Sequence, residues 1–192
     1  MIAANRYAFK EWAVVCKALE TGRQSVLLRK GGIHERGGRF EVEHNEFWLF
    51  PTRFHQNADE IRAEARPLLQ HAAAEAPIAN SVRLSLYAVV DEVVELADES
   101  LLPRLADLQI LADGTLRERF RYRRPGLFVL TVRIYRRAAP ITLPESPHFA
   151  GCRTWVDLEQ DLTTDGLVPV LDDAAYSARV SAVRSALADP PT

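Results

Sequence analysis

Residues 116–135 read Leu-Arg-Glu-Arg-Phe-Arg-Tyr-Arg-Arg-Pro-Gly-Leu-Phe-Val-Leu-Thr-Val-Arg-Ile-Tyr. Apolar and polar residues alternate in the first half, and the second half is rich in branched and aromatic residues. Between them, Arg124-Pro125-Gly126 is typical of a turn. This pattern predicts an antiparallel β-hairpin that pairs residues 116–123 with residues 127–135.

Strand-like patterns recur on the N-terminal side of that stretch. Residues 12–19 and 24–30 are largely apolar runs around a glycine-containing turn, and they predict another hairpin. Residues 82–96 are rich in valine and leucine, which favours a strand. The apolar run 47–50 indicates a strand buried on both faces, and Pro51 marks its end or an edge.

In the middle of the chain, Ser-Leu-Leu-Pro at 100–103 is expected to open a short helix, and one longer helix is predicted before it. Asn57 followed three residues later by Glu60 is typical of a helix start. The helix is expected to run toward Ala76, with a kink or a break at Pro67, because proline removes a backbone donor.

A second helix is predicted near the C-terminus, over about 173–188, with Asp172 or Asp173 as its cap. One face repeats apolar residues at helical spacing, namely Tyr176, Val180, Val183 and Leu187. Two hairpins with helices in the middle and at the C-terminus predict an α+β fold with a largely antiparallel mixed sheet.

Length and composition indicate one globular domain over residues 1–192. The chain has 47% hydrophobic and 26% charged residues, and it contains no internal repeat or linker. Its formal net charge of −2 favours neither nucleic acid nor membrane for the molecule as a whole. Composition leaves the oligomeric state open.

The two cysteines, Cys16 and Cys152, are too few for a disulfide framework. The first residues show no signal-peptide pattern, and no apolar run reaches membrane-spanning length. We therefore expect reduced thiols, a cytoplasmic location and no membrane partner.

Four segments resemble the bacterial family catalogued as domain of unknown function 1802. They are Phe-Lys-Glu-Trp-Ala-Val-Val at 9–15, Leu-Arg-Lys-Gly-Gly-Ile at 28–33, Phe-Pro-Thr at 50–52 with His-Gln at 55–56, and Gly-Cys-Arg-Thr-Trp-Val at 151–156. The resemblance implies no particular chemistry. The family's recurrent residues fall here on Arg29, Lys30, Gly31, Gly32, Pro51, Thr52, His55, Gln56, Cys152 and Trp155.

The expected order of elements also resembles that of the Nudix hydrolases. Those enzymes carry an Arg-Glu-x-x-Glu-Glu run on a helix, which holds divalent metal on a pyrophosphate. The corresponding residues 59–66 read Asp-Glu-Ile-Arg-Ala-Glu-Ala-Arg, without that run. The resemblance therefore implies a related scaffold that lacks the usual active site.

The stretch from Arg23 to Arg39 is a candidate anion site. Five basic residues stand there against one acid, Glu35. The amides of Gly31 and Gly32 are suited to an anion-binding nest, to which flanking guanidinium groups add charge. The alternative is a solvated loop in which glycine serves only the turn conformation. Neither a P-loop nor a Gly-x-Gly-x-x-Gly motif is present.

Four arginines form a second candidate surface. If residues 116–123 are a strand, the alternate side chains point one way, about 7 Å apart, and repel one another without an anionic partner. These residues are Arg117, Arg119, Arg121 and Arg123. The partner is either a nucleic-acid backbone or the protein's own acids, which are frequent in 91–99 and 157–165.

The loop after the 47–50 strand holds Thr52, Arg53, His55 and Gln56. Loops at strand ends often carry functional residues, and histidine titrates near neutral pH, so His55 is a candidate base or ligand. The alternative is a structural histidine beside residues that cap the next helix.

Carboxylates form the remaining candidate. Glu41 and Glu43 share one face of a strand expected over residues 40–44, with His44 and Glu46 nearby. Carboxylate and imidazole groups can bind divalent metal, but no recognised ligand spacing is present and no metal site is assigned.

The leading hypothesis is non-covalent binding of a phosphate-bearing ligand, a nucleotide or a nucleic acid. The residues expected to bind it are Arg29, Lys30, Gly31, Gly32, Thr52, Arg53, His55 and Gln56, with the four arginines as a nucleic-acid surface. One alternative is a metal-dependent phosphoester or pyrophosphate hydrolase that uses His55, Glu41 and Glu43. Another is a scaffold with no ligand. The sequence leaves open whether the protein is an enzyme and which cofactor it uses.

Overall fold

The computed structural model describes residues 1–30, 42–53, 56–75, 77–151 and 153–188. The strands are β1 (Ala4–Trp12), β2 (Val26–Arg29), β3 (Glu46–Thr52), β4 (Ser81–Leu96), β5 (Leu127–Pro144), β6 (Trp155–Thr163) and β7 (Leu167–Pro169). The α-helices are α1 (Ala13–Glu20), α2 (Pro67–Ala74), α3 (Asp113–Arg121) and α4 (Asp173–Leu187). Short 3₁₀ helices are η2 (Ala63–Ala65), η3 (Glu99–Leu108) and η4 (Pro147–Phe149).

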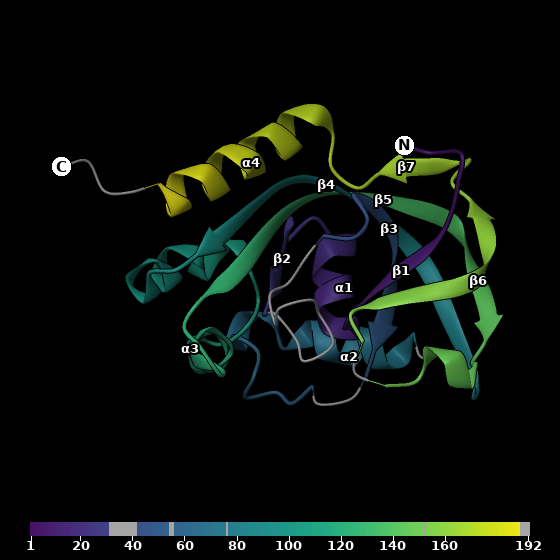
Figure 1. Ribbon diagram of the computed structural model, residues 1–192, viewed down its shortest axis with the longest axis horizontal. Helices are drawn as coiled ribbons and strands as arrows, with labels where there is room; N and C mark the ends of the chain where they lie inside the picture. The colour runs from purple at the N-terminus through teal and green to yellow at the C-terminus, as the bar shows by residue number, and fades with distance from the viewer. Residues whose placement is uncertain (31–41, 54–55, 76, 152, 189–192) are drawn as a thin grey trace.

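The strands form one mixed sheet in the order β2-β5-β4-β3-β1-β6, with β7 paired to β5. β1 and β3 run parallel, and the other recorded strand pairs are antiparallel. This confirms the α+β fold with a largely antiparallel mixed sheet. Figure 1 shows the sheet wrapping around α1, while α4 runs along the top of the view, above β4 and β5.

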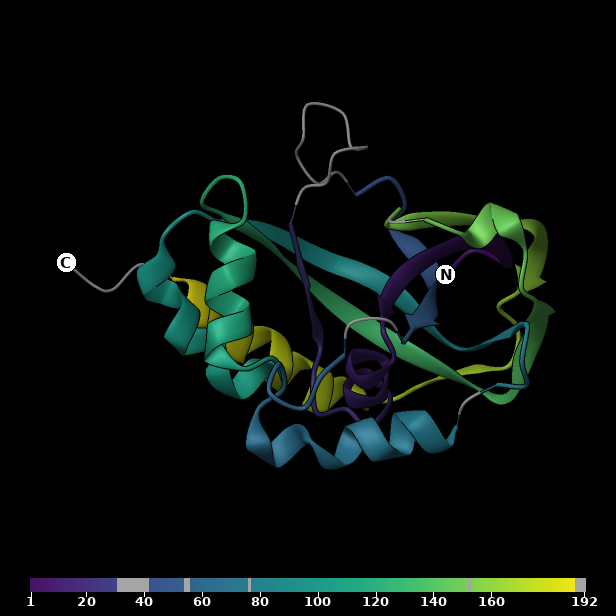
Figure 2. The same ribbon diagram turned by 90° about the horizontal axis from the view of Figure 1, so that it is seen from below.

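The sheet curls because β4 and β5 form a long ribbon with two register shifts, between Leu84 and Leu86 and between Val90 and Glu92. The far half of the ribbon consequently comes to lie opposite β6, as Figure 2 shows. Val156 of β6 packs there with residues of β4 and β5 in a second, smaller core. The main core lies between the sheet and the helices and includes Leu19 of α1.

Residues 12–19 were expected to pair as a strand with 24–30, and this is wrong, because Ala13–Glu20 is helical. A short apolar run is compatible with either a buried strand or a buried helix. Here a contact with a distant residue favours the helix. The Gln56 side chain accepts a hydrogen bond of 3.0 Å from Val14 N, in the first helical turn. β2 pairs instead with β5.

The other predicted hairpin is wrong in the same way, because α3 occupies Asp113–Arg121. Leu116 and Phe120 are four residues apart, so a helix buries both against the main core. Only residues 127–135 are a strand, as part of β5, whose neighbour is β4.

The central region differs from its prediction. Asn57 and Glu60 form a turn in which Asn57 N donates to Glu60 Oε2, at 2.8 Å, but no helix starts there. Instead α2 begins at Pro67, since proline fits the first turn of a helix and not its interior. The strand expected over 40–44 lies partly outside the described residues, and residues 42–45 are not strand.

The predictions for two strands and for the C-terminal helix are confirmed. β3 and β4 match the strands expected over 47–50 and 82–96. Asp172 caps α4 by accepting from Ala175 N, and Tyr176, Val180 and Val183 are buried. Cys16 is buried and unpaired, whereas Cys152 lies outside the described residues. None of the helices in the described ranges is both long and apolar enough to span a membrane.

Candidate ligand-binding site

The parallel strands β1 and β3 end side by side, and a buried carboxylate lies at this point. The Glu11 side chain is only 2% exposed, and its Oε2 lies 3.3 Å from an Arg29 nitrogen. The same Arg29 side chain donates to the carbonyl of Lys10 and lies over the Phe9 ring, 4.1 Å from its centroid. Arg29 is therefore held by the protein itself, although its Nε is buried without a partner.

A second guanidinium approaches the same carboxylate from α3. Arg119 Cζ lies 4.3 Å from the centroid of the Trp12 ring. Burial lowers the pKa of Arg119, and the Arg29 charge lowers it further, while Glu11 and Glu60 oppose the shift. We call Glu11, Trp12, Arg29 and Arg119 the arginine cluster, because it brings two positive charges to one negative charge.

Hydrogen bonds from Thr52 and Gln56 fix the cluster to the start of α1. Thr52 Oγ1 donates to the Glu11 carbonyl at 3.1 Å. Gln56 Nε2 donates to the Thr52 carbonyl at 2.6 Å, while its Oε1 caps Val14 N. Thr52 and Gln56 thus lie near Arg29, as expected, but their recorded bonds are with backbone groups of the protein.

Lys30 points away from the cluster, toward the end of α3. Its Nζ donates to the carbonyls of Phe120 and Gly126, each at 2.7 Å, and to that of Arg124. An ammonium group has three donors, so these bonds occupy all of them. Positive charge is favourable at a helix C-terminus, and Lys30 therefore anchors α3, which carries Arg119.

The other expected site residues divide into two groups. Arg53 is exposed, one residue beyond the end of β3, and Glu43 is exposed before β3. The rest lie outside the described residues, namely Gly31, Gly32, Glu41 and His55. Among the residues that are described, no three His, Cys, Asp or Glu side chains are placed to hold a metal ion.

The four arginines expected on one strand face are dispersed, because α3 turns about 100° per residue. Arg119 faces Trp12, whereas Arg121 forms a two-bond pair with Glu99, at 2.9 and 2.7 Å. Arg117 is exposed, and Arg123 follows the helix with its guanidinium near the Tyr122 ring. Pairing with the protein's own acids thus accounts for Arg121.

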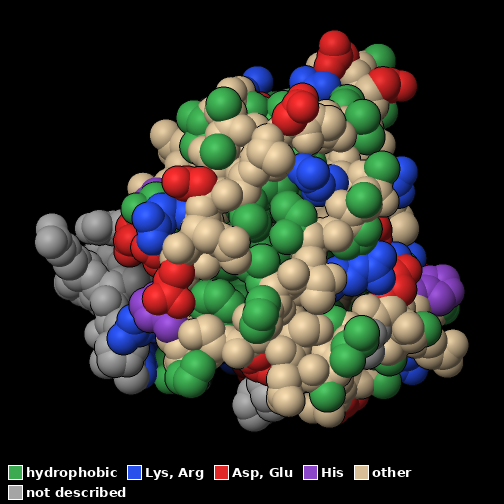
Figure 3. Space-filling view, turned by 90° about the vertical axis from the view of Figure 1, so that its right-hand side faces the viewer, with side chains coloured by type: hydrophobic (Ala, Val, Ile, Leu, Met, Phe, Trp, Pro, Cys, Tyr) green, Lys and Arg blue, Asp and Glu red, His purple; other side chains and the backbone are tan. Residues whose placement is uncertain are grey.

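A pocket of about 230 Å³ lies beside the start of β6. Its lining includes Tyr7, Lys10, His44, His148, Arg153 and Trp155. We call it the Trp155 pocket. Figure 3 views the β6–β7 end of the molecule, where hydrophobic side chains fill the middle and charged side chains and histidines surround them. Sequence reasoning missed this pocket, because its walls come from segments that are far apart in the chain.

His44 belongs to a row of packed rings in this pocket. Its ring stacks on Tyr7, with centroids 3.6 Å apart and planes inclined by 11°, and meets the Trp155 ring edge-on at 5.2 Å. Burial lowers the pKa of the His44 imidazole, although Glu43 and Asp157 attract the charged form. His44 is therefore neutral at pH 7.

We expect His44 to make stability depend on pH. Because its pKa is lower in the folded state than in the unfolded state, unfolding takes up protons below about pH 6.5. The free energy of unfolding should therefore fall as the pH drops from about 7 to 5. Replacing His44 by phenylalanine should flatten this trend, measured by urea denaturation across that range. An unchanged pH profile in the variant would contradict the assignment.

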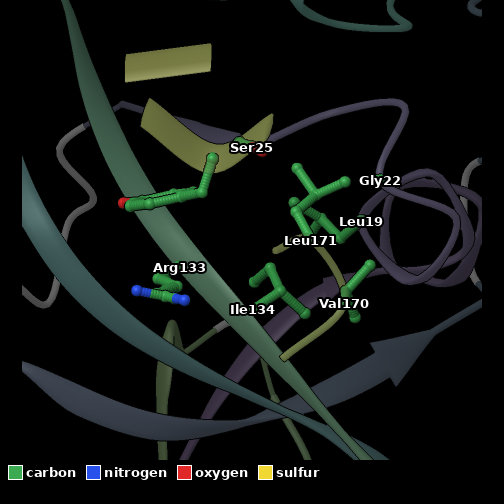
Figure 4. Close-up of a pocket in the computed structure, with 8 residues that line it drawn as sticks. Leu19, Gly22, Ser25, Arg133, Ile134, Val170 and Leu171 are labelled. Carbon is green, nitrogen blue, oxygen red and sulfur yellow. The ribbon is translucent and has the colours of Figure 1, made fainter. Parts of the chain in front are cut away.

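A second cavity, shown in Figure 4, holds only about 10 Å³, room for roughly one water molecule. It lies where the segment before α4 meets the sheet, with Val170 and Leu171 on one side and Arg133 on the other. The Arg133 guanidinium pairs with Asp173 and lies 5.3 Å from the Tyr176 ring centroid. This arrangement docks α4 and leaves no space for a ligand.

Comparisons with known proteins give one family and a small set of similar structures. A family model described as a domain of unknown function (DUF1802) matches residues 8–182. No curated protein matches the chain in sequence. The structure is similar to the crystal structure of ASCH from Zymomonas mobilis, with 14% identity, a TM-score of 0.43, and coverage of 91% of this chain and 93% of that one. A tyrosine-to-phenylalanine mutant of that protein gives 15% identity, a TM-score of 0.43, and coverage of 91% and 96%.

Proposed function

This chain belongs to the DUF1802 family, and we propose that it binds a phosphate-bearing ligand, a nucleotide or a nucleic acid, non-covalently at the arginine cluster. The binding group is the guanidinium of Arg119, assisted by the charge of Arg29. Arg53 lies near the end of β3 and adds a positive charge on the exposed side. Gly31 and Gly32 follow Lys30 directly in the sequence, and we propose that their amides contribute to the same site.

The observation that carries this proposal is the state of Arg119. Its guanidinium has five N–H donors and is half-buried over Trp12. Within the described part of the chain it makes no hydrogen bond or ion pair, and the ring is its recorded contact. Its donors therefore lack acceptors among the described residues but still reach solvent, since no Arg119 nitrogen is both fully buried and unpaired. A phosphate oxygen pair supplies those acceptors in bidentate geometry.

The other expected residues have positioning roles in this proposal. Lys30 anchors the C-terminal end of α3, and hence Arg119, against β2. Thr52 and Gln56 hold the backbone of Glu11 and the first turn of α1. Glu11 keeps Arg29 in place, and the Arg119 guanidinium has no ion-pair partner within the described residues, although the charges of Glu11 and Glu60 both act on it.

Replacing Arg119 by alanine is expected to weaken the binding of ATP and of a labelled single-stranded oligonucleotide by about tenfold or more. Hydrogen bonds to charged groups contribute about 1.5–3 kcal/mol, and 1.4 kcal/mol is tenfold in affinity. For the oligonucleotide, the slope of log affinity against log salt should also fall by about one, because one phosphate contact is lost. Titrations at two salt concentrations measure both quantities.

Arg117→Ala is the matched control, because Arg117 is on the same helix and exposed. It should change affinity far less than Arg119→Ala, and a thermal melt should show that both variants remain folded. If neither ATP nor the oligonucleotide binds the wild-type protein at low salt, the proposal is wrong. Equal losses of affinity in the two variants would indicate that the ligand binds to the exposed surface of α3 and not specifically at Arg119.

A further inference from the structure

The Trp155 pocket is separate in composition from the arginine cluster, since the two share no residue. Its walls come from β1, β6, η4, residues 43 and 44, and Ala150 with Arg153. Its volume of about 230 Å³ lies just below the roughly 300–1,000 Å³ of pockets that take drug-sized ligands. The pocket therefore suits a smaller molecule.

Aromatic rings form much of the lining. Tyr7, His44 and Trp155 are each half-buried, so part of each side chain remains accessible. Phe9 and Phe47 pack behind the Trp155 indole, with ring centroids at 5.0 and 5.1 Å. The pocket rings are thus supported by the main core and cannot collapse into the cavity without disturbing it.

Both kinds of hydrogen-bonding group surround these rings. Two of the polar residues are already fixed, because Lys10 Nζ donates to the Gly151 carbonyl at 2.8 Å and Asp157 Oδ1 accepts from Arg6 Nε at 2.8 Å. The more accessible groups are the exposed side chains of Glu43, His148 and Arg153. They offer a carboxylate acceptor together with cationic and imidazole donors at the rim.

We propose that the Trp155 pocket is a binding site for a nucleobase. A planar heterocycle is suited to extend the stack that the Tyr7 and His44 rings form, and its edge carries donors and acceptors that match the mixed rim. A purely aliphatic ligand would leave the polar groups of the rim without hydrogen-bond partners. A simple anion would be repelled by the carboxylates of the rim as well as attracted by its cations. The site does not depend on the arginine cluster, and it takes a nucleoside that carries no phosphate.

The test uses adenosine, guanosine, cytidine and uridine as probes, titrated into the full chain by calorimetry and by tryptophan fluorescence. At least one nucleoside should bind at millimolar concentration or below and alter the emission of Trp155. Tyr7→Leu should weaken that binding by about 5- to 140-fold, since base stacking on an aromatic ring contributes about that factor. Arg153→Ala should weaken it less, because only rim contacts are lost.

Matched controls separate the pocket from the rest of the surface. Tyr122→Leu removes a tyrosine that is 55% exposed elsewhere, and Arg83→Ala removes an exposed arginine outside the pocket. Neither should change nucleoside affinity, and Arg119→Ala should not either. If no nucleoside binds, or if Tyr7→Leu binds as well as wild type, the nucleobase assignment is wrong. Ribose 5-phosphate competing at the pocket while nucleosides do not would overturn it in favour of a phosphate site.

The same probes keep this proposal distinct from the phosphate site. Nucleosides carry no phosphate, so their failure to bind contradicts the nucleobase pocket and leaves the arginine cluster untouched. Conversely, a wild-type protein that binds adenosine but shows no extra affinity for ATP contradicts only the phosphate proposal. Binding of both, with Tyr7→Leu and Arg119→Ala each affecting its own probe, supports the two sites separately.

Discussion

Replacing Glu11 by leucine is expected to lower the free energy of unfolding by about 3 kcal/mol, because the change leaves the Arg29 charge without its buried partner. This cost is at the lower end of the range for breaking a buried ion pair, because the Arg29 side chain is 18% exposed and remains partly solvated. Trp12 N also loses the Glu11 oxygen that it reaches at 2.7 Å. Urea denaturation of wild type and variant measures the difference.

The double variant Glu11→Leu with Arg29→Met distinguishes a lost ion pair from poor packing. Replacing both members of a buried pair with apolar residues is often neutral or stabilising. The double variant should therefore recover most of the stability that Glu11→Leu loses. A double variant as unstable as the single one would show that the cavity shape, and not the charge of Arg29, sets the cost.

Replacing Gly22 by alanine is expected to lower the free energy of unfolding by about 2–4 kcal/mol. Gly22 follows α1 with φ +69, a left-handed conformation that costs other residues about 1–2 kcal/mol. A Cβ there also comes within 2.5 Å of Leu171 Cδ2, in the tightly packed region of Figure 4. Overpacking of this kind costs about 1–3 kcal/mol. Urea denaturation again measures the loss.

Two other glycines separate the causes of that loss. Gly166 has φ +73, but no atom beyond its chain neighbours lies within 4 Å of the position that an added methyl group would take, so Gly166→Ala should cost only about 1–2 kcal/mol for its backbone conformation. Gly114 lies in α3 with open space around it, and Gly114→Ala should be neutral or stabilising. If Gly22→Ala costs no more than Gly166→Ala, Leu171 moves aside and the steric part of the prediction is wrong.

Arg29 and Lys30 contribute to the stability of the fold, so a loss of ligand binding in their variants can also come from unfolding. Both side chains bond to the protein's own backbone, so their replacement is expected to lower stability as well as affinity. Arg119 does not share this difficulty, because its recorded contact is a single ring. It is therefore the residue whose replacement tests ligand binding most directly.

The sequence by itself determined the fold class and the elements whose pattern admits one interpretation. β4 is long and rich in valine and leucine, and α4 has a capping Asp172 with apolar residues at helical spacing. In both elements, the intrinsic preference of the residues and the burial of one face favour the same secondary structure. Long-range contacts therefore did not change it.

Only the tertiary structure decided whether residues 13–20 and 113–121 are helices. Residues 13–20 are a short apolar run that suits either a buried strand or a buried helix. In 113–121 the two apolar residues, Leu116 and Phe120, are four apart, which fits one face of a strand as well as one face of a helix. Gln56 and Lys30, which are distant in sequence, supply the end contacts that complete these helices. The helical turn of α3 then directs Arg119 inward and leaves Arg117 exposed, which no alternating pattern foretells.

The candidate sites depend on the tertiary structure for the same physical reason. A side chain is available to a ligand only if the fold leaves its donors unused, and the fold uses those of Lys30 while leaving those of Arg119. The Trp155 pocket likewise exists because the curled sheet brings Tyr7, His44 and Arg153 together from distant segments. Sequence determines which groups the chain carries, whereas long-range packing determines which of them meet and which remain free.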